Sequence, residues 1–228
     1  MSTPILELEH VTGKGHGFRL SDISFSMQSG YIYGLMGVNG AGKSTLLKTI
    51  VNENAKYRGT IRVLGEDIRK NHARLMNRIA FVSEEHPFFE DRTARQNAQT
   101  LGLLFESFSM EKFEQVMAEM QLSCGKIYKK MSRGERLKFQ LAFAMAYEPA
   151  LYLIDEATAG MDPVFREDFF MMLQQIIKEE KASILMTSHI ESEMELKADY
   201  VGIMEAGKLV SFGECPEVLP VFANSEHA

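Results

Sequence analysis

The sequence predicts an α/β fold with a mostly parallel sheet, an N-terminal antiparallel β subdomain and an α-helical insertion. Short apolar segments alternate with helical ones up to residue 86 and again from residue 151, which is typical of parallel sheets covered by helices. Between residues 87 and 130 the hydrophobic period becomes helical. The 228 residues, 45% of them hydrophobic, suffice for one domain with a full core. We therefore expect a single domain over residues 1–228, with its core in 1–86 and 131–228 and the helical insertion in 87–130.

The individual elements follow from the same patterns. Alternating apolar and polar residues predict half-exposed strands over 5–11 and 20–27. Further strands are expected over 31–36, 61–64, 79–82, 151–154 and 184–187. Helices are expected over 44–51, 93–105, 110–122 and 163–179 and near Glu191, with a hairpin around Ala206-Gly207.

Composition and charge narrow the class of function. The net charge of −6 and the pI of about 5.6 argue against a free-standing nucleic-acid-binding domain, because such domains are usually basic. Cys124 and Cys215 show no metal-ligand or redox spacing, and we expect two ordinary thiols in a reducing compartment. No apolar stretch approaches the roughly 20 residues that cross a bilayer, and residues 1–4 do not resemble a signal peptide. We therefore expect any membrane role to depend on a partner.

A glycine-rich motif lies between the expected strand 31–36 and helix 44–51: Gly37-Val38-Asn39-Gly40-Ala41-Gly42-Lys43-Ser44. It matches G-x-x-x-x-G-K-[ST]. Glycines let backbone amides approach phosphate oxygens, and a helix N-terminus favours an anion. In such a loop Lys43 reaches the β- and γ-phosphates and Ser44 binds Mg²⁺. The motif therefore predicts a P-loop NTPase core.

Acidic residues follow another buried strand. Asp155 and Glu156 come directly after 151–154, at the edge of the sheet where ligands bind in α/β proteins. We expect Asp155 to hold Mg²⁺, directly or through water, and Glu156 to activate the attacking water as general base. His189 follows the strand 184–187 and is expected at the same edge, in contact with the γ-phosphate.

Together these residues resemble the ATP-binding subunit of ABC transporters. The resemblance covers nearly the whole chain. It includes Ser132 and Gly134 in a signature segment, Met131-Ser132-Arg133-Gly134-Glu135, which we define as residues 131–135. It also includes Ala159-Gly160-Met161-Asp162 in the D-loop position and His189 in the H-loop position.

The resemblance implies ATP and Mg²⁺ as cofactors and a second ATP-binding subunit, identical or related, packed head to tail. Ser132 and Gly134 are then expected to contact the γ-phosphate bound by the other subunit, with Asp162 acting across the interface. The nucleotide-binding residues implied within this chain are Gly37, Val38, Asn39, Gly40, Ala41, Gly42, Lys43, Ser44 and Thr45. A basic cluster that opens a helix fits the same role, or is a solvated helix face: Lys126, Lys129, Lys130, Arg133, Arg136 and Lys138.

The resemblance further implies a separate transmembrane permease and a peripheral place at the cytoplasmic face of the cell membrane. The permease is expected to dock near residues 84–97, where Phe88 and Phe89 are apolar anchors or core residues of the insertion. The compact length is most similar to small bacterial exporter ATPases for peptides or drugs. Import of a nutrient stays open, and no nucleic-acid partner is expected.

The chain departs from the family pattern at three places. The usual signature Leu-Ser-Gly-Gly-Gln has Arg133 and Glu135 here, and Arg133 either adds charge near the phosphates or pairs with Glu135. Glu84 stands where the family has the glutamine of the Q-loop; a carboxylate still binds Mg²⁺ but donates no amide hydrogen bond. We expect Glu84→Gln to keep or raise ATPase activity. Residues 13–18 have glycine or histidine where the family commonly has the tyrosine that stacks on adenine. We expect His16 or Phe18 to take this role; the alternative for Phe18 is a core position in a strand.

A soluble ABC-type ATPase is the alternative to a transporter subunit, and a P-loop kinase is a third class. A soluble ABC-type ATPase without a permease usually carries a long coiled coil or a second ATPase in the same chain, and neither is present here. A P-loop kinase would leave Ser132, Gly134, Asp162 and His189 unexplained.

Overall fold

The structure, a computed structural model, describes residues 3–14, 19–85, 87–158, 160–180, 182–188, 194–195 and 197–219. It contains two sheets. The larger is mostly parallel, with strand order β10-β9-β3-β8-β7-β6, and only β10 runs antiparallel to its neighbour. Its strands are β3 (Ile32–Met36), β6 (Ile79–Val82), β7 (Leu151–Ile154), β8 (Ser183–Thr187), β9 (Tyr200–Glu205) and β10 (Lys208–Glu214).

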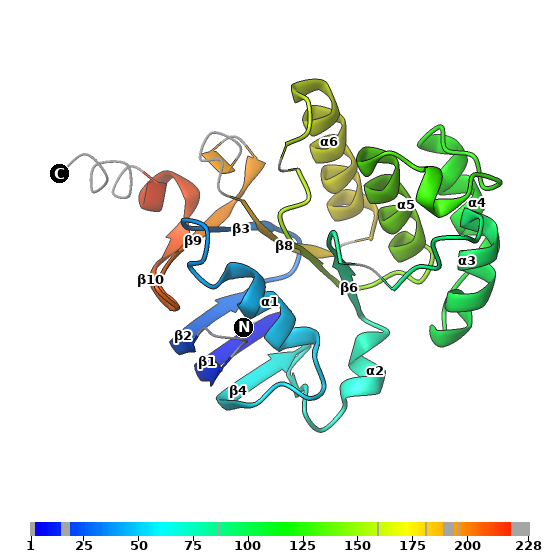
Figure 1. The fold of residues 1–228 in the computed structure, drawn as a ribbon. Coiled ribbons are helices and arrows are strands. Elements are labelled where there is room, and N and C mark those ends of the chain that lie inside the picture. The colour runs from blue at the N-terminus through cyan, green and yellow to red at the C-terminus, as the bar shows by residue number, and fades with distance from the viewer. Residues whose placement is uncertain are drawn as a thin grey trace.

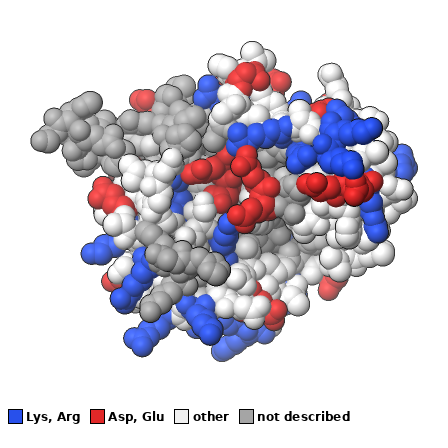
Figure 2. All heavy atoms as spheres, viewed as in Figure 1, with Lys and Arg blue, Asp and Glu red and all other residues white. Residues whose placement is uncertain are grey.

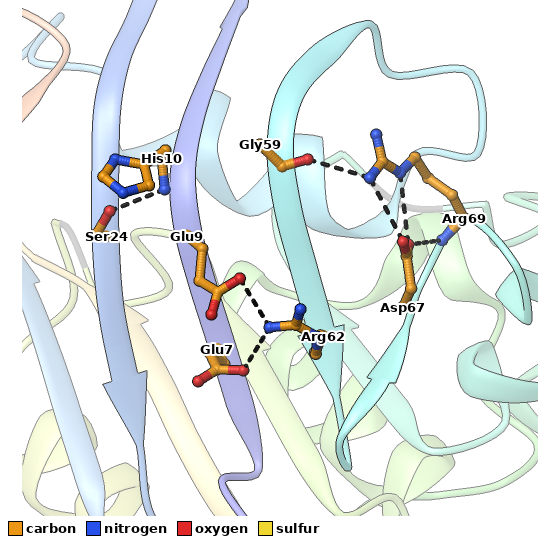
Figure 3. A network of polar contacts seen from close by, with 8 residues as sticks. All are labelled: Glu7, Glu9, His10, Ser24, Gly59, Arg62, Asp67 and Arg69. Atoms are coloured by element: carbon orange, nitrogen blue, oxygen red, sulfur yellow. Dashed lines mark hydrogen bonds and ion pairs between the residues drawn. The ribbon is translucent and has the colours of Figure 1, made fainter.

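The smaller sheet is antiparallel and lies at the N-terminal side, with order β2-β1-β4-β5. Its strands are β1 (Leu6–Lys14), β2 (Arg19–Met27), β4 (Tyr57–Val63) and β5 (Glu66–Asp67). On its outer surface Arg62 of β4 bridges Glu7 and Glu9 of β1, at 2.9 and 2.8 Å (Figure 3). Opposite charges on neighbouring strands support this register, in which Glu7 faces Arg62.

The helices divide into two groups. Helix α1 (Lys43–Val51) lies between the two sheets, and α6 (Pro163–Glu180) and the short α2 (His72–Met76) complete the sheet layers (Figure 1). The second group stands together on one side of the molecule in Figure 1. It comprises α3 (Ala94–Leu101), η1 (Gly102–Leu104), α4 (Met110–Glu119), η2 (Tyr128–Lys130) and α5 (Arg133–Met145).

The parallel sheet is buried on both faces. In β7, Leu151 and Leu153 belong to the core that α1 shares with the antiparallel sheet, whereas Tyr152 and Ile154 belong to the core packed by α3 to α6. All four side chains are buried, which explains why this strand is a continuous apolar run rather than an alternating one. Because β3, β8, β7 and β6 run parallel, their C-terminal ends lie at one edge of the sheet, next to the glycine-rich loop that follows β3.

The predicted fold class is confirmed. The strands expected over 79–82 and 151–154 have those bounds, and the terminal hairpin is β9–β10. The helix expected over 93–105 is shorter, because α3 ends at Leu101 and continues as the 3-10 turn η1. Residues 191–193, where a helix was expected near Glu191, lie outside the described residues.

Candidate nucleotide-binding site

The glycine-rich loop turns through backbone conformations that favour glycine. Gly37, Gly40 and Gly42 have φ angles of 147°, 83° and 109°. A Cβ atom on Gly37 would lie 2.3 Å from the carbonyl oxygen of Met204 on β9, a contact that the backbone cannot relieve cheaply. Gly42 is the N-cap residue of α1, so no side chain caps this helix end. The amides of the first turn are therefore open to an anion.

Lys43 is held at the mouth of this loop. Its side chain is only 3% exposed, and its Nζ donates a 2.8 Å hydrogen bond to the carbonyl oxygen of Gly37. The same Nζ lies 3.4 Å from Oε1 of Glu156. A buried ammonium needs such partners, because burial without them disfavours the charged form. The cation is thus fixed beside the loop amides.

A hydroxyl–carboxylate network joins α1 to two strand ends. The Ser44 hydroxyl donates to Oδ1 of Asp155 at 2.8 Å, and the Thr187 hydroxyl donates to the same oxygen at 2.9 Å. The backbone amide of Glu156 in turn donates to Thr187 Oγ1 at 2.9 Å. Asp155, which is 9% exposed, is therefore oriented from α1 and β8 together.

Glu156 has an unusual backbone. Its φ angle is 45°, a left-handed conformation that is uncommon for a residue other than glycine. Such conformations cost free energy and tend to occur at functional sites. Here the turn places the side chain beside Lys43, at the edge of the sheet.

The donor set fits Mg²⁺ bound by few protein ligands. Ser44 and Asp155 supply a hydroxyl and a carboxylate oxygen 2.8 Å apart, and hard oxygen donors suit this ion. Among the described residues no three His, Cys, Asp or Glu side chains gather as a metal site. Mg²⁺ usually keeps several waters and binds through one or two carboxylates plus substrate phosphates, which agrees with this set.

These groups open onto a cavity of about 210 Å³. Its lining side chains are Ser44, Lys48, Ser83, Glu84, Glu85, Arg133, Asp155 and Glu156. In Figure 2 acidic side chains gather at the centre of this face, with Lys and Arg side chains beside them toward α5. The nearby Lys48 amino group lies 2.7 Å from Glu85 and lowers the pKa of that carboxyl.

The signature segment forms the start of α5. Ser132 is its N-cap, and the Ser132 hydroxyl accepts a 3.2 Å hydrogen bond from the amide of Glu135. The Glu135 side chain accepts in return from the Ser132 amide at 2.8 Å, which completes a capping box. Lys126 holds the Glu135 carboxylate at 2.7 Å and lowers its pKa.

Gly134 faces a neighbouring helix of its own chain. A Cβ atom there would lie 2.7 Å from the ring of Phe165 on α6. A second link to α6 comes from Asp162, whose Oδ1 accepts from the Phe165 amide at 2.9 Å just before that helix begins. The segments expected to act across a subunit interface are thus packed on each other.

Comparison with known proteins identifies the family. A model of the ABC transporter family matches residues 20–159, more than half of the chain. The chain belongs to this family. It is 31% identical over 214 residues to the bacitracin transport ATP-binding protein BcrA of Bacillus licheniformis, which covers 92% of this chain and 69% of that protein. It is 29% identical over 210 residues to the uncharacterized ABC transporter ATP-binding protein YhcH of Bacillus subtilis, which covers 90% and 68%.

Solved structures agree on the fold. An ATP-binding subunit of an ABC transporter superposes with a TM-score of 0.84 at 24% identity, covering 96% of this chain and 93% of the other. An ATP-binding cassette of an ABC transporter in its ADP conformation gives a TM-score of 0.83 at 20% identity, covering 99% and 98%. The chain is thus an ATP-hydrolysing nucleotide-binding domain of the ABC family. Within the described residues, no helix combines the length and apolarity needed to span a membrane.

Two of the expected ABC site residues cannot be placed. Phe18, expected to stack on adenine, and His189, expected at the γ-phosphate, lie outside the described residues, as do His16 and Ala159. The remaining expected residues around the phosphate loop, Lys43, Ser44, Asp155 and Glu156, are brought together as described above.

The basic cluster largely behaves as a set of paired surface charges. Lys126 pairs with Glu135, Lys129 with Asp91, and Arg133 with Glu84. Arg136 lies over the ring of Tyr128 at 5.1 Å and Lys138 over that of Phe165 at 5.8 Å. These contacts favour the solvated-face alternative for the lysines.

The two phenylalanines near the expected docking region differ. Phe88 packs on the helical core, against Tyr128, Phe139 and Phe143, whereas Phe89 is exposed beneath the guanidinium of Arg92. Phe88 is therefore a core residue of the insertion, and Phe89 remains available as an anchor.

Sequence reasoning missed two parts of the site. Thr187, which orients Asp155 and accepts from the Glu156 amide, was expected only as the last residue of the strand 184–187 that precedes His189. The contact between Arg133 and Glu84 was also not predicted, because Glu84 was expected only as a Mg²⁺ ligand and Arg133 only near the phosphates or paired with Glu135. Thr187 could have been identified from its position, because it is a buried threonine at the end of β8, the strand that pairs with β7.

Proposed function

We propose that this chain is the ATP-hydrolysing subunit that powers export of a peptide, drug or similar cargo through a separate membrane permease. The observation that carries the proposal is the meeting of Lys43, Ser44, Asp155 and Glu156 at the open N-terminus of α1. A cation, a metal-binding pair and a carboxylate stand together beside amides suited to phosphate. Hydrolysis of a bound triphosphate requires these groups.

In this proposal the loop of residues 37–45 holds the triphosphate. Backbone amides at the start of α1 bind phosphate oxygens, and the helix dipole favours their charge. The Lys43 amino group moves from its carbonyl and carboxylate partners to the β- and γ-phosphates. In the structure the Lys43 amino group already lies beside the loop, 2.8 Å from the carbonyl oxygen of Gly37.

Mg²⁺ would be held by Ser44 and Asp155, with Glu84 as a further ligand at the rim of the same cavity. When bound, the ion neutralises charge on the β- and γ-phosphate oxygens. Thr187 keeps Asp155 oriented, and Glu156 accepts the proton of the attacking water as general base. His189 completes this set of catalytic residues by contacting the γ-phosphate.

A second ATP-binding subunit, identical or related, completes each site. Ser132 and Gly134 of one subunit contact the γ-phosphate held by the other, and Asp162 acts across the interface. ATP drives pairing because it binds the paired state more tightly than the separate subunits. Within each subunit, residues 1–86 and 131–228 form the ATP-binding core and 87–130 the helical insertion of a single domain.

The coupling to export rests on relatives. BcrA of Bacillus licheniformis is named a bacitracin transport ATP-binding protein, and YbhF of Escherichia coli, 25% identical over 228 residues, a probable multidrug ABC transporter ATP-binding protein. The methionine import ATP-binding protein MetN of Corynebacterium efficiens is also similar, at 29% identity over 216 residues, and import is the second candidate direction. The subunit would lie at the cytoplasmic face of the membrane, bound through its permease. The alternative is a soluble ABC-type ATPase without a permease.

The first experiment measures the mass of the Glu156→Gln variant in solution, with and without Mg-ATP. Removing the base should trap the ATP-bound pair, so a monomer that becomes a dimer only with ATP supports paired sites in identical subunits. A variant that binds ATP but stays monomeric would overturn the identical pair and leave a related subunit as the partner. The wild-type chain, which hydrolyses its ATP, is the control.

The second experiment tests the permease. The tagged chain is purified from detergent-solubilised membranes of its host, and the co-purifying proteins are identified by mass spectrometry. A multi-spanning protein recovered in fixed proportion, and lost when Phe89→Asp is introduced, supports coupling to a permease. Full recovery of the chain in the soluble fraction, without such a protein, favours the alternative.

A further inference from the structure

Glu84 and Arg133, two of the residues at which this chain departs from the family pattern, contact each other. Glu84 follows β6 and occupies the Q-loop position, and Arg133 is the first residue of α5 in the signature segment. Nε of Arg133 lies 2.5 Å from Oε1 of Glu84. The unusual carboxylate and the unusual guanidinium therefore form one ion pair within a single subunit.

This pair lies on the wall of the phosphate site. Both residues line the cavity that contains Ser44, Asp155 and Glu156. Both also line an adjacent cavity of about 370 Å³ that extends toward Met131 and Leu137. A Cβ atom on Gly160, in the D-loop position, would lie 3.2 Å from Nη1 of Arg133. Arg133 thus reaches away from its own helix and into the site of its own subunit.

Each carboxylate that lines the phosphate cavity has a distinct positive or hydrogen-bonding partner. Asp155 accepts from two hydroxyls, Glu156 pairs with Lys43, and Glu85 pairs with Lys48. Glu84 forms its ion pair with Arg133. Without it, a carboxylate would face a site that must accept a triphosphate, and like charges at short range weaken binding.

We propose that Arg133 is a positioning residue that acts within its own subunit: it neutralises Glu84 and holds that carboxylate at the Mg-ATP site. The inference rests on the proposed function, because it assumes that the cavity receives the phosphates and Mg²⁺. It assigns Arg133 a role different from the one proposed for Ser132 and Gly134, which is contact with the nucleotide of a partner subunit. A carboxylate can thereby occupy the Q-loop position without weakening nucleotide binding.

The test is the Kd of a fluorescent ATP analogue with Mg²⁺, measured on dilute protein that is monomeric. Arg133→Ala should weaken binding about fivefold, the scale of one exposed ion-pair interaction. Glu84→Gln alone removes the carboxylate charge, keeps a side-chain oxygen for Mg²⁺ and leaves the Arg133 charge beside the phosphates, so it should strengthen binding. The double variant Glu84→Gln/Arg133→Ala should return to within about twofold of the wild type, and Arg133→Lys should retain most of the affinity.

Ionic strength separates a charge effect from a structural one. The loss in Arg133→Ala should shrink as salt rises, because both side chains are partly exposed, at 43% and 66%. Lys112→Ala breaks an ion pair with Glu148, and because neither residue lines the phosphate cavity, this variant is the matched control and should bind normally. Thermal unfolding of all variants shows whether each one is folded.

Three results would overturn the inference. One is an equal loss from Arg133→Ala with Glu84 present and with Glu84→Gln. Another is unchanged binding by the monomer together with lost ATP-dependent pairing, which would give Arg133 a role toward the partner's nucleotide. The last is a loss that does not change with salt. If the wild-type chain itself fails to bind the analogue, the proposed function fails instead.

Discussion

The phosphate loop and the signature segment each place a serine at the start of a helix, and they use it differently. At α1 the N-cap is Gly42, and the Ser44 hydroxyl donates to Asp155, so the first amides of the helix stay open. At α5 the Ser132 hydroxyl and the Glu135 carboxylate cap the helix between them. The first site is ready for an anion, whereas the second already satisfies its own amides.

The phosphate site is also more deeply buried than the signature segment. Lys43 and Asp155 are almost wholly buried, and each is held by short polar contacts. The polar signature side chains, Ser132, Arg133 and Glu135, are exposed or half-buried, and Arg133 and Glu135 are held by ion pairs with Glu84 and Lys126. Surface pairs contribute little each and weaken with salt. We therefore expect the phosphate loop to be rigid before ATP binds and the signature segment to adjust when a partner arrives.

The largest test of this difference removes one lysine from each region. Lys43→Ala should reduce ATP hydrolysis by about a hundredfold or more, because a preorganised cation at the transferring phosphoryl group is lost. Lys126→Ala removes a lysine that precedes the signature segment and pairs with its Glu135, at 36% and 30% exposure, and should change hydrolysis by less than about fivefold. Steady-state ATPase rates measure both. Similar losses in the two variants would show that the signature charge is as deeply involved as the loop cation.

The next test adds one methyl group to each region. Gly37→Ala places Cβ against the Met204 carbonyl at a positive φ and should lower the free energy of unfolding by about 2–4 kcal/mol. Gly134→Ala meets the Phe165 ring, which can rotate, and should lower it by about 1 kcal/mol. Urea denaturation gives both values.

Two controls accompany this pair. Gly40 has a positive φ of 83° and open space around an added Cβ. Gly40→Ala therefore measures the free-energy cost of the backbone conformation alone, without the steric clash that Gly37→Ala adds. Phe165→Leu combined with Gly134→Ala should recover part of the loss at the signature segment. A cost for Gly134→Ala as large as that for Gly37→Ala would show that α5 and α6 are packed as tightly as the loop.

A third test removes the two serine hydroxyls. Ser132→Ala takes away an N-cap and should lower the free energy of unfolding by about 1 kcal/mol. Ser44→Ala removes no cap, so it should change stability less, while the loss of a Mg²⁺ ligand should raise the Mg²⁺ concentration needed for half-maximal hydrolysis. Urea denaturation and Mg²⁺ titrations of ATPase activity separate the two roles. Equal stability losses would mean that Ser44 also supports its helix.

The phosphate loop was predictable because its chemistry is local. Glycine spacing, the apolar run before it and the helical period after it lie within a few residues of one another, and the acids at 155 and 156 follow directly from a buried strand. Parallel strands bring their C-terminal ends to one edge, so no further information is needed to place Asp155 near Ser44. The hydrogen bond of 2.8 Å between the Ser44 hydroxyl and Asp155 agrees with that reasoning.

The pairing of exposed charges was not predictable in the same way. Arg133 had Glu135 as a near neighbour in sequence, yet the structure pairs Arg133 with Glu84 and Glu135 with Lys126. The choice depends on how α5 packs against the segment after β6, which periodicity does not specify. Thr187 was missed for a related reason, since a single threonine at a strand end forms no pattern until the strand order is known.

The smallest expected effect is the pH dependence of the cap at α5. The Lys126 amino group and the Ser132 amide hold the pKa of the Glu135 carboxyl below its usual value. Because the folded-state pKa is lowered, the stabilisation is present above the unfolded value of about 4.3 and is lost as the pH falls through the folded value. Glu135→Gln keeps the capping box and removes the ion pair, so it should cost about 0.5 kcal/mol at pH 7 and almost nothing near pH 3. Urea denaturation across this range, with Glu205→Gln on the exposed β9 end as control, checks the prediction. A cost that persists at low pH would assign the stabilisation to the shape of the cap rather than to its charge.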